Sequence, residues 1–420
     1  MKYKLRFAAA AVLAVVAAAV LYKQLKNNLV DWYADNYYVR TTLHPATEVP
    51  DQVCLTWSDD PRTTQTVQWR TATSITDGWV QFRKAGTTGL AVFEAEAGRI
   101  VIEDPLLQTD PVNHRFTATL RDLDPDTEYS YRVGSKVRDT WSDWHPFKTA
   151  PAEATDFSFM YLGDAQLGLI AWGRLLQNAH QQYSDSAFYV IAGDLVNSGG
   201  WRNEWDQFFN SGKGVFDRRP LIPCIGNHDL DKQDTPELYL NLFALPENGP
   251  ENLTPERAYS FEYGNVLFVV LDSNESIEEQ GPWLEQQLAQ SNAIWKIAVY
   301  HHPAYSSAPH RDNREVRECW CPLFDKYHVD MALQGHDHAY LRTYPMKDGK
   351  PVASPGDGTI YAVTVSGTKY YEQEQHDYAE VAFPNVSTYQ VIDIYTRPNQ
   401  LTYRAYDTLG NVRDEVVIEK

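Results

Sequence analysis

Apolar and polar side chains alternate with a period of two along short segments in the first third of the chain. The segments are separated by turn residues and recur roughly every ten residues between positions 41 and 149. Alternation at this spacing predicts an antiparallel β-sandwich, in which one face of each strand is buried and the other faces water. The pattern is carried by residues 53–57, 66–70, 79–84, 116–120 and 129–133.

Longer apolar runs replace this alternation after a small, Pro-containing stretch at residues 149–154. They are separated by segments with helical spacing, such as residues 171–180 and 280–290. Strands that alternate with helices predict an α/β domain with layered sheets, and the change of pattern places the domain boundary at the Pro-containing stretch. The predicted strands are residues 157–162, 188–192, 220–225, 266–271, 294–300 and 329–333, and residues 390–394, 401–406 and 416–418 are expected to complete the outer sheet.

The first residues combine basic side chains with an unbroken apolar run. Lys2, Lys4 and Arg6 precede the apolar residues 7–22, as in the charged and hydrophobic parts of an export signal. Residues 1–28 are therefore predicted to be either a cleaved export signal or a short membrane anchor, which would tether the protein. Both outcomes predict an exported protein that is periplasmic, secreted, or anchored in the membrane and facing outward.

Composition narrows the classes of protein. A length of 420 residues allows about two or three domains. The 56 acidic residues outnumber the 37 basic ones, and the resulting net charge of −19 argues against nucleic-acid binding, because the phosphate backbone would be repelled. An anionic small substrate would then need positive charge concentrated in a pocket, such as metal ions. The four cysteines are interpreted as ordinary buried thiols.

Five of the predicted strands run into the same kind of polar motif. The motifs are GDAQ at 163–166, GD at 193–194, GNHD at 226–229, HHP at 301–303 and GHDH at 335–338. Ligands of α/β sheets bind just beyond the carboxyl ends of the strands, so we expect these motifs to converge on one crevice. A glycine before most of the polar residues removes side-chain bulk where the backbone turns sharply beside the site.

The polar residues of these motifs are aspartate, asparagine and histidine. Oxygen and imidazole ligands of this kind suit divalent first-row metals rather than Ca²⁺ or a thiolate site. About seven ligands are too many for one tetrahedral ion, whereas two metals about 3.5–4 Å apart fit the inventory and can clamp a phosphoryl group. Each motif alone is typical of an ordinary turn, but in this order at strand ends they predict a dinuclear metal site.

The series GDAQ, GD, GNHD, HHP and GHDH is similar to that of the calcineurin-like metallophosphoesterases. Residues 120–133 resemble the end of a fibronectin type III domain, where a Pro-containing turn leads into a Tyr-rich strand. A metallophosphoesterase series placed after such a domain resembles the purple acid phosphatase branch. The resemblance implies a fibronectin III-like β-sandwich over residues 41–149, followed by a four-layer α/β/β/α metallophosphoesterase domain over residues 155–420.

The same resemblance implies which residues hold the metals and predicts that one aspartate bridges them. It assigns one metal to Asp164, Asp194 and His338, and the other to Asp194, Asn227, His301 and His336.

Two departures from the family pattern affect the choice of metal. Asn197 stands where purple acid phosphatases have the tyrosine that colours a ferric ion, and Gln166 stands where other branches have a histidine. An amide oxygen of Gln166 or Asn197, or a water molecule, is expected to fill the vacant position. The two ions are thus predicted to be transition metals, with Fe, Mn and Zn all open, and we do not expect a purple protein.

The predicted activity is that of an exported, acid-phosphatase-like enzyme. It would hydrolyse phosphomonoesters, small phosphate esters being the expected substrates, by attack of a metal-bridging hydroxide. His228, with its pKa tuned by Asp229, would stabilise the developing charge or protonate the leaving oxygen. In the loop at residues 306–313, the resemblance implies His310 as a phosphate contact and Arg311 is a further candidate; a solvated polar loop is the alternative interpretation.

Two other functions stay open at this stage. A phosphodiesterase or nucleotidase would use the same metal core, because only the surrounding loops distinguish the ester types. A non-catalytic cell-surface binding protein would use the β-sandwich as its working part. The intact series of aspartate and histidine residues argues against the second alternative.

Overall fold

The structure is a computed structural model that describes residues 38–86 and 92–420. The predicted export signal or anchor at residues 1–28 lies outside the described residues. Within the part of the chain that is described, no helix combines the length and apolar character that a membrane crossing requires.

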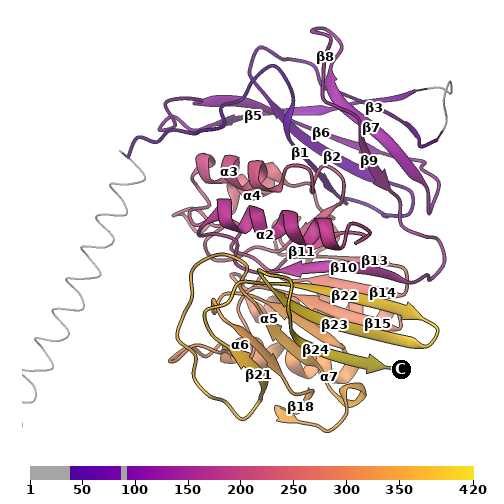
Figure 1. Ribbon diagram of the computed structural model, residues 1–420, viewed down its shortest axis with the longest axis vertical. Coiled ribbons are helices and arrows are strands. Elements are labelled where there is room, and N and C mark those ends of the chain that lie inside the picture. The colour runs from indigo at the N-terminus through magenta and orange to yellow at the C-terminus, as the bar shows by residue number, and fades with distance from the viewer. Residues whose placement is uncertain (1–37, 87–91) are drawn as a thin grey trace, which may run out of the picture.

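The alternating segments of the first third form two antiparallel sheets that pack face to face (Figure 1). Their core is aromatic: Trp69 and Phe116 lie opposite each other on neighbouring strands with ring centroids 5.4 Å apart. The predicted sandwich is therefore present. Its strands, in spatial order, are β1 (Asp51–Thr56), β2 (Gln65–Thr71), β6 (Val112–Leu120) and β5 (Gly98–Glu103) in one sheet, and β4 (Phe93–Glu96), β3 (Trp79–Lys84), β7 (Glu128–Ser135) and β8 (Thr140–Trp141) in the other, where β9 (His145–Lys148) also pairs with β7.

The second part of the chain contains two larger mixed sheets. The six-stranded sheet has the order β12 (Leu221–Pro223), β11 (Tyr189–Ile191), β10 (Phe157–Leu162), β22 (Thr388–Thr396), β23 (Asn399–Asp407) and β24 (Val412–Glu419). The seven-stranded sheet has the order β13 (Tyr259–Tyr263), β14 (Val266–Val270), β15 (Trp295–Val299), β16 (Met331–Gln334), β20 (Ile360–Val363), β17 (Tyr340–Thr343) and β21 (Ala379–Phe383).

Strand β14 shows why these sheets form layers. Its residues alternate between two cores: Val266, Phe268 and Val270 pack between the two sheets, whereas Leu267 and Val269 pack under the outer helices. Successive side chains of a strand point to opposite faces, so a strand that is apolar throughout must be covered on both sides.

Helices cover both outer faces of the sheet pair, which completes a four-layer α/β/β/α arrangement (Figure 1). One side carries α2 (Leu169–Gln182), α3 (Arg202–Gly212) and α4 (Glu237–Leu242), and the other carries α5 (Ile277–Gln290), α6 (Arg314–Cys319) and α7 (Cys321–Tyr327).

The predicted and observed strands agree for the long apolar runs, and the chain's last strands complete a sheet as predicted. The strands β22, β23 and β24 form one half of the six-stranded sheet, with β24 at its edge. β22 pairs antiparallel with β10 and so lies inside the six-stranded sheet that also carries the first three predicted motifs. This pairing joins segments more than 200 residues apart, and strand pattern alone does not specify such a partner.

The sandwich and the four-layer domain share one interface. Trp57 at the end of β1 is buried against Phe188 and Tyr263, with ring centroids 5.3 Å and 5.7 Å away. On the same interface, the buried Arg70 of the sandwich forms a 2.6 Å ion pair with Asp206 of α3. A buried guanidinium is tolerated only when it is paired, so this ion pair fixes the position of α3 against the sandwich.

We predict that the substitution Arg70→Met lowers the free energy of unfolding by about 3–5 kcal/mol, because it leaves the Asp206 carboxylate buried without its cation. Denaturant titration measures the loss. Arg121→Met is the matched control, because Arg121 pairs with Asp59 at the exposed surface and its removal should change stability little. Equal stability of the two variants would contradict this account of the interface.

Candidate metal centre

The five predicted motifs follow strands that run in the same direction. In the six-stranded sheet, β10, β11 and β12 are neighbouring parallel strands, and in the other sheet β15 and β16 are neighbouring parallel strands. Their carboxyl ends therefore meet at one edge of the sheet pair, as predicted. The side chains that these ends present are Asp164, Asp194, Asn227, His301, His336 and His338.

The ligating atoms of these side chains form two overlapping groups. Atoms of Asp164, Asp194 and His338 all lie within 4.8 Å of one another, and so do atoms of Asp194, His301 and His336. Asp194 belongs to both groups, which is the arrangement expected of a bridging carboxylate. Two of the three histidines and both aspartates are fully buried or nearly so.

Hydrogen bonds to the main chain orient two of the imidazole rings. His301 Nδ1 lies 2.9 Å from the carbonyl oxygen of Ala192, and His338 Nδ1 lies 3.0 Å from that of Lys369. Because a carbonyl oxygen only accepts, each Nδ1 carries a proton and the Nε2 lone pair faces the carboxylates. Metal-binding histidines are commonly held by such a bond on the other ring nitrogen.

Two carboxamides were candidates for the vacant ligand position, and the structure brings only one of them into the cluster. Gln166 Nε2 lies 2.6 Å from Asp194 Oδ2 and 3.0 Å from His338 Nε2, and its Oε1 is buried with no hydrogen-bond partner among the described residues. The Asn197 side chain instead contacts Ser198 Oγ at 3.4 Å. Gln166 is therefore the amide that lies in the cluster. Its nitrogen faces the ligand atoms, and a 180° turn of the carboxamide would bring the unpartnered Oε1 to that place instead.

The side chain of Asn227 reaches the second group. Its Oδ1 lies 3.2 Å from His301 Nε2, and His336 Nδ1 lies 3.2 Å from the same nitrogen. Asn227 Oδ1, His301 Nε2 and His336 Nδ1, from the loops after β12, β15 and β16, thus lie close together. With Asp194, these residues are the set assigned to the second metal.

The pKa values of the cluster are shifted because two carboxylates are buried next to each other. Burial, together with the charge of Asp194, raises the pKa of Asp164 well above its usual value. Burial also opposes charge on His301, but the adjacent Asp194 carboxylate outweighs it and raises the pKa of His301 to about 9. A cation between the carboxylates would stabilise both charged forms. The donor set of carboxylate, amide and imidazole fits transition metal ions at this place.

Several of these residues hold unusual backbone conformations. Asp164, Asp194, His336 and His338 have φ angles of 43°, 53°, 74° and 47°, in the left-handed region that most residues avoid. Strain of this kind persists where the surrounding structure imposes it, and it is common at functional sites.

Glycines before the motif residues let the chain approach the ligands closely. A Cβ on Gly335 would lie 2.6 Å from Asp164 Oδ2 and 2.7 Å from the carbonyl oxygen of Ala192. A Cβ on Gly226 would overlap the main chain and the carboxylate of Asp194. The predicted reason for these glycines, removal of side-chain bulk beside the site, agrees with this packing.

No hydrogen bond joins the Asp229 carboxylate to the ring of His228, on which Asp229 was expected to act. The buried Asp229 carboxylate accepts hydrogen bonds from the N–H groups of Leu195, Val196 and Gly226 instead. It therefore holds the loop after Asp194 against the loop that carries Asn227. The buried N–H groups of these two loops need an acceptor, and a buried carboxylate supplies it. The half-exposed imidazole of His228 has no such need because water can reach it.

His228 itself lies beside the cluster. Its main-chain N–H donates to Asp194 Oδ1 at 2.9 Å, and its Nδ1 lies 2.8 Å from the carbonyl oxygen of Asn197. Nδ1 must then carry the proton in this bond, so Nε2 is the ring nitrogen that can take up or release another. This agrees with the predicted proton-transfer role.

The two predicted phosphate contacts in the loop at residues 306–313 have different surroundings. His310 is exposed, with a φ of 62°. Arg311 Nη1 donates to the carbonyl oxygen of His336 at 3.0 Å and to Asp337 Oδ1 at 3.3 Å. The structure thus fixes Arg311 beside the GHDH motif, and it gives His310 no comparable anchor among the described residues.

Some residues that shape the site carry no sequence motif. Glu204 of α3 accepts hydrogen bonds from the N–H groups of Asn197 and Ser198, at 2.8 Å and 3.0 Å. Tyr371 packs its ring against His338 with centroids 4.6 Å apart. Each contact depends on a tertiary arrangement, so strand and turn patterns contain no signal for it.

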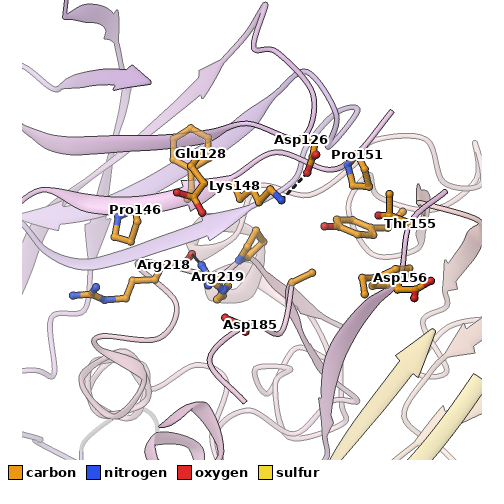
Figure 2. A pocket seen from close by; sticks show the side chains of 15 residues that line it. Asp126, Glu128, Pro146, Lys148, Pro151, Thr155, Asp156, Asp185, Arg218 and Arg219 are labelled. Atoms are coloured by element: carbon orange, nitrogen blue, oxygen red, sulfur yellow. Dashed lines mark hydrogen bonds and ion pairs between the residues drawn. The ribbon is translucent and has the colours of Figure 1, made fainter. Parts of the chain in front are cut away.

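A separate pocket of about 260 Å³ lies between the sandwich and the catalytic layers (Figure 2). Its lining mixes charges, with Lys148 paired to Asp126 at 2.6 Å and Arg218 and Arg219 nearby. None of the predicted metal ligands lines it. The chemistry expected of the motifs therefore belongs to the strand ends and not to this pocket.

A β-sandwich followed by a four-layer domain with two metal-ligand groups at its strand ends defines a metallophosphoesterase class. Residues 50–149 match the family described as purple acid phosphatase, N-terminal domain, and residues 142–340 match calcineurin-like phosphoesterase. The chain belongs to the calcineurin-like metallophosphoesterase superfamily, in its purple acid phosphatase-like branch. The two ligand groups at the strand ends are candidate metal sites of the kind that the name calcineurin-like phosphoesterase leads one to expect.

Individual relatives are distant. An uncharacterized protein of Mycobacterium tuberculosis is 28% identical over 277 residues, which cover 56% of this chain and 51% of that protein. "Probable purple acid phosphatase 20" of Arabidopsis thaliana is 26% identical over 349 residues, 77% of each chain. This chain thus spans about half the length of the mycobacterial relative, and other Arabidopsis relatives are named "Probable inactive purple acid phosphatase".

A solved structure shares the fold. The purple acid phosphatase from yellow lupin (Lupinus luteus) seeds superposes with a TM-score of 0.76 at 19% identity, and the match covers 89% of this chain and 74% of the lupin chain. At this identity the match establishes the architecture of sandwich and metallophosphoesterase layers.

We predict that Gly335→Ala weakens metal binding by about 10- to 100-fold, because the added methyl group displaces Asp164 from the cluster. Competition with a coloured chelator measures the affinity. Gly281→Ala is the matched control, because a Cβ at this helical position meets no atom within 4 Å. Unchanged metal affinity in the Gly335 variant would show that Asp164 does not bind metal from its observed position.

Proposed function

We propose that this protein is an exported, dinuclear metal-dependent phosphatase that hydrolyses phosphomonoesters. The observation that carries the proposal is the pair of ligand groups that share Asp194. Such a shared carboxylate is the geometry that two-metal phosphoester hydrolysis requires. Family membership supports the class of reaction, and the finer points, export and monoester preference, are our inference.

The residues that would hold the metals follow from the geometry. Asp164, Asp194 and His338, together with the Gln166 amide oxygen, would hold one ion, and Asp194, Asn227, His301 and His336 would hold the other. Bound there, the two ions would supply the positive charge that orients the phosphoryl oxygens and lowers the pKa of a water molecule to near neutrality. Fe, Mn and Zn all suit these donors, and the absence of a tyrosine at position 197 argues against a purple colour.

The protein's own groups would then act on the substrate. His228, whose Nε2 is free to exchange a proton, would protonate the leaving oxygen. Arg311, held beside His336 at the rim of the site, would bind an anionic group of the substrate other than the phosphoryl oxygens held by the ions. Asp229 and Glu204 would keep the loops that carry Asp194 and Asn227 in place, so they act on position rather than on the proton.

The cellular setting is inferred from the sequence. The basic and apolar residues 1–28 support export, with or without a membrane tether. The net charge of −19 supports a small phosphate ester rather than a nucleic acid as the substrate.

We predict that the purified protein releases phosphate from 4-nitrophenyl phosphate, and that extraction of metal with a chelator abolishes this activity. His336→Ala should lower kcat at least about a hundredfold, because it removes a ligand of the charge that stabilises the transition state. Lys347→Gln is the control, because Lys347 is the exposed residue of β18 (Met346–Lys347).

Steady-state kinetics with added Mn²⁺, Zn²⁺ or Fe²⁺ provides the measurement, and a bis(4-nitrophenyl) phosphate assay compares the ester types. Faster turnover of the diester would replace the monoesterase assignment by a diesterase. Full turnover by the His336 variant would exclude the proposed site altogether.

A further inference from the structure

Two cations lie close to one tyrosine ring at the edge of the candidate metal centre. The guanidinium carbon of Arg311 lies 4.8 Å from the ring centroid of Tyr371, and the ammonium nitrogen of Lys369 lies 5.0 Å from it. The same ring packs against His338 with centroids 4.6 Å apart. An aromatic ring attracts cations through its negative face, so Tyr371 keeps both charges next to a candidate ligand.

Main-chain contacts fix the distance of this cluster from the metal ligands. The Tyr371 N–H donates to the carbonyl oxygen of His338 at 3.2 Å, and the Lys369 carbonyl oxygen accepts from His338 Nδ1 at 3.0 Å. Arg311 bonds to the carbonyl oxygen of His336 and to Asp337, not to an inward-facing ligand atom. The two cations therefore lie outside the ligand atoms, at the rim of the site.

Both cations keep capacity for a ligand. The Arg311 side chain is 31% exposed, and its hydrogen bonds to described residues use only Nη1, although a guanidinium has five N–H donors. Its carboxylate partner Asp337 also accepts from the N–H groups of Ser307 and Ala308, so the charge of Asp337 is shared. Lys369 is half-buried.

We propose that Arg311 and Lys369 form a second anion subsite, and that the enzyme prefers phosphate monoesters whose leaving group carries a further anionic group such as a carboxylate. The inference rests on the proposed phosphatase function. Metals at the strand ends would hold the phosphate that is cleaved, so cations at the rim face the rest of the substrate. Three groups already lie within 5.0 Å of the Tyr371 ring centroid, which favours recognition of charge over stacking of a nucleobase.

The test compares two esters that differ in one group. 3-Phosphoglycerate carries a carboxylate where glycerol 3-phosphate carries a hydroxymethyl group, and both have an alkyl leaving oxygen. We expect kcat/KM to favour 3-phosphoglycerate about tenfold in the wild type, mainly through KM, because a charge-assisted contact of this kind is strong. Raising the salt concentration should reduce the preference.

Variants separate the subsite from general damage. Lys369→Gln keeps the main-chain bond to His338 and should lower the preference about tenfold. Tyr371→Leu should also lower it, whereas Tyr371→Phe keeps the ring and should retain it. Lys347→Gln controls for the loss of one positive charge elsewhere.

Each contrary outcome has a defined meaning. The preference is the ratio of kcat/KM for 3-phosphoglycerate to kcat/KM for glycerol 3-phosphate. A ratio near one in the wild type, or a ratio that Lys369→Gln leaves unchanged, overturns the subsite. If Lys369→Gln weakens inhibition by inorganic phosphate as much as it weakens use of 3-phosphoglycerate, the cations bind the cleaved phosphate and the second subsite is refuted.

Failure of the proposed function gives a different result, because neither ester would then be hydrolysed. In that case, calorimetric titration of the metal-loaded protein with the two esters makes the same comparison by binding alone. Tighter binding of 3-phosphoglycerate that depends on Lys369 would support the subsite, and equal affinities would overturn it.

Discussion

The burial of two aspartate carboxylates side by side is the constraint on which the catalytic layers depend. Asp164 and Asp194 are 0% and 1% exposed and follow neighbouring parallel strands. Two buried like charges are costly unless hydrogen bonds and cations compensate them. The main-chain N–H groups of His336 and His228 donate to these carboxylates, and imidazoles face them. The loops, the glycines and the proposed metals all serve to keep the two charges together.

This constraint explains why the site draws on both sheets and on the sandwich. The six-stranded sheet supplies the two carboxylates, whereas the seven-stranded sheet supplies the three imidazoles. Helix α3 then links the site to the sandwich, because its Glu204 holds the N–H groups after Asp194 while its Asp206 pairs with Arg70. The sandwich contributes no ligand among the described residues, but it fixes the helix that supports the bridging aspartate.

The sequence predicts the parts of the fold and site that depend on local pattern. Apolar runs such as residues 157–162 identify buried strands, and the ordered motifs after them identify the six clustered side chains. The short strands β17, β20 and β21 escape prediction, since four or five residues carry too little periodicity. The same motifs do not specify the direction of each side chain, so the contacts of Asp229, and the choice between Gln166 and Asn197, emerge only in the folded structure. Residues such as Glu204 and Tyr371 reach the site only through tertiary packing.

The central claim is that Asp194 joins two metal sites into one centre. Metal analysis of the natively purified protein, compared with Asp194→Asn, tests it most directly, because a shared ligand affects both ions whereas a ligand of one ion affects one. We predict two transition metal ions per chain in the wild type and loss of both in Asp194→Asn. Two ions retained by the variant, or one ion or none in the wild type, would contradict the account.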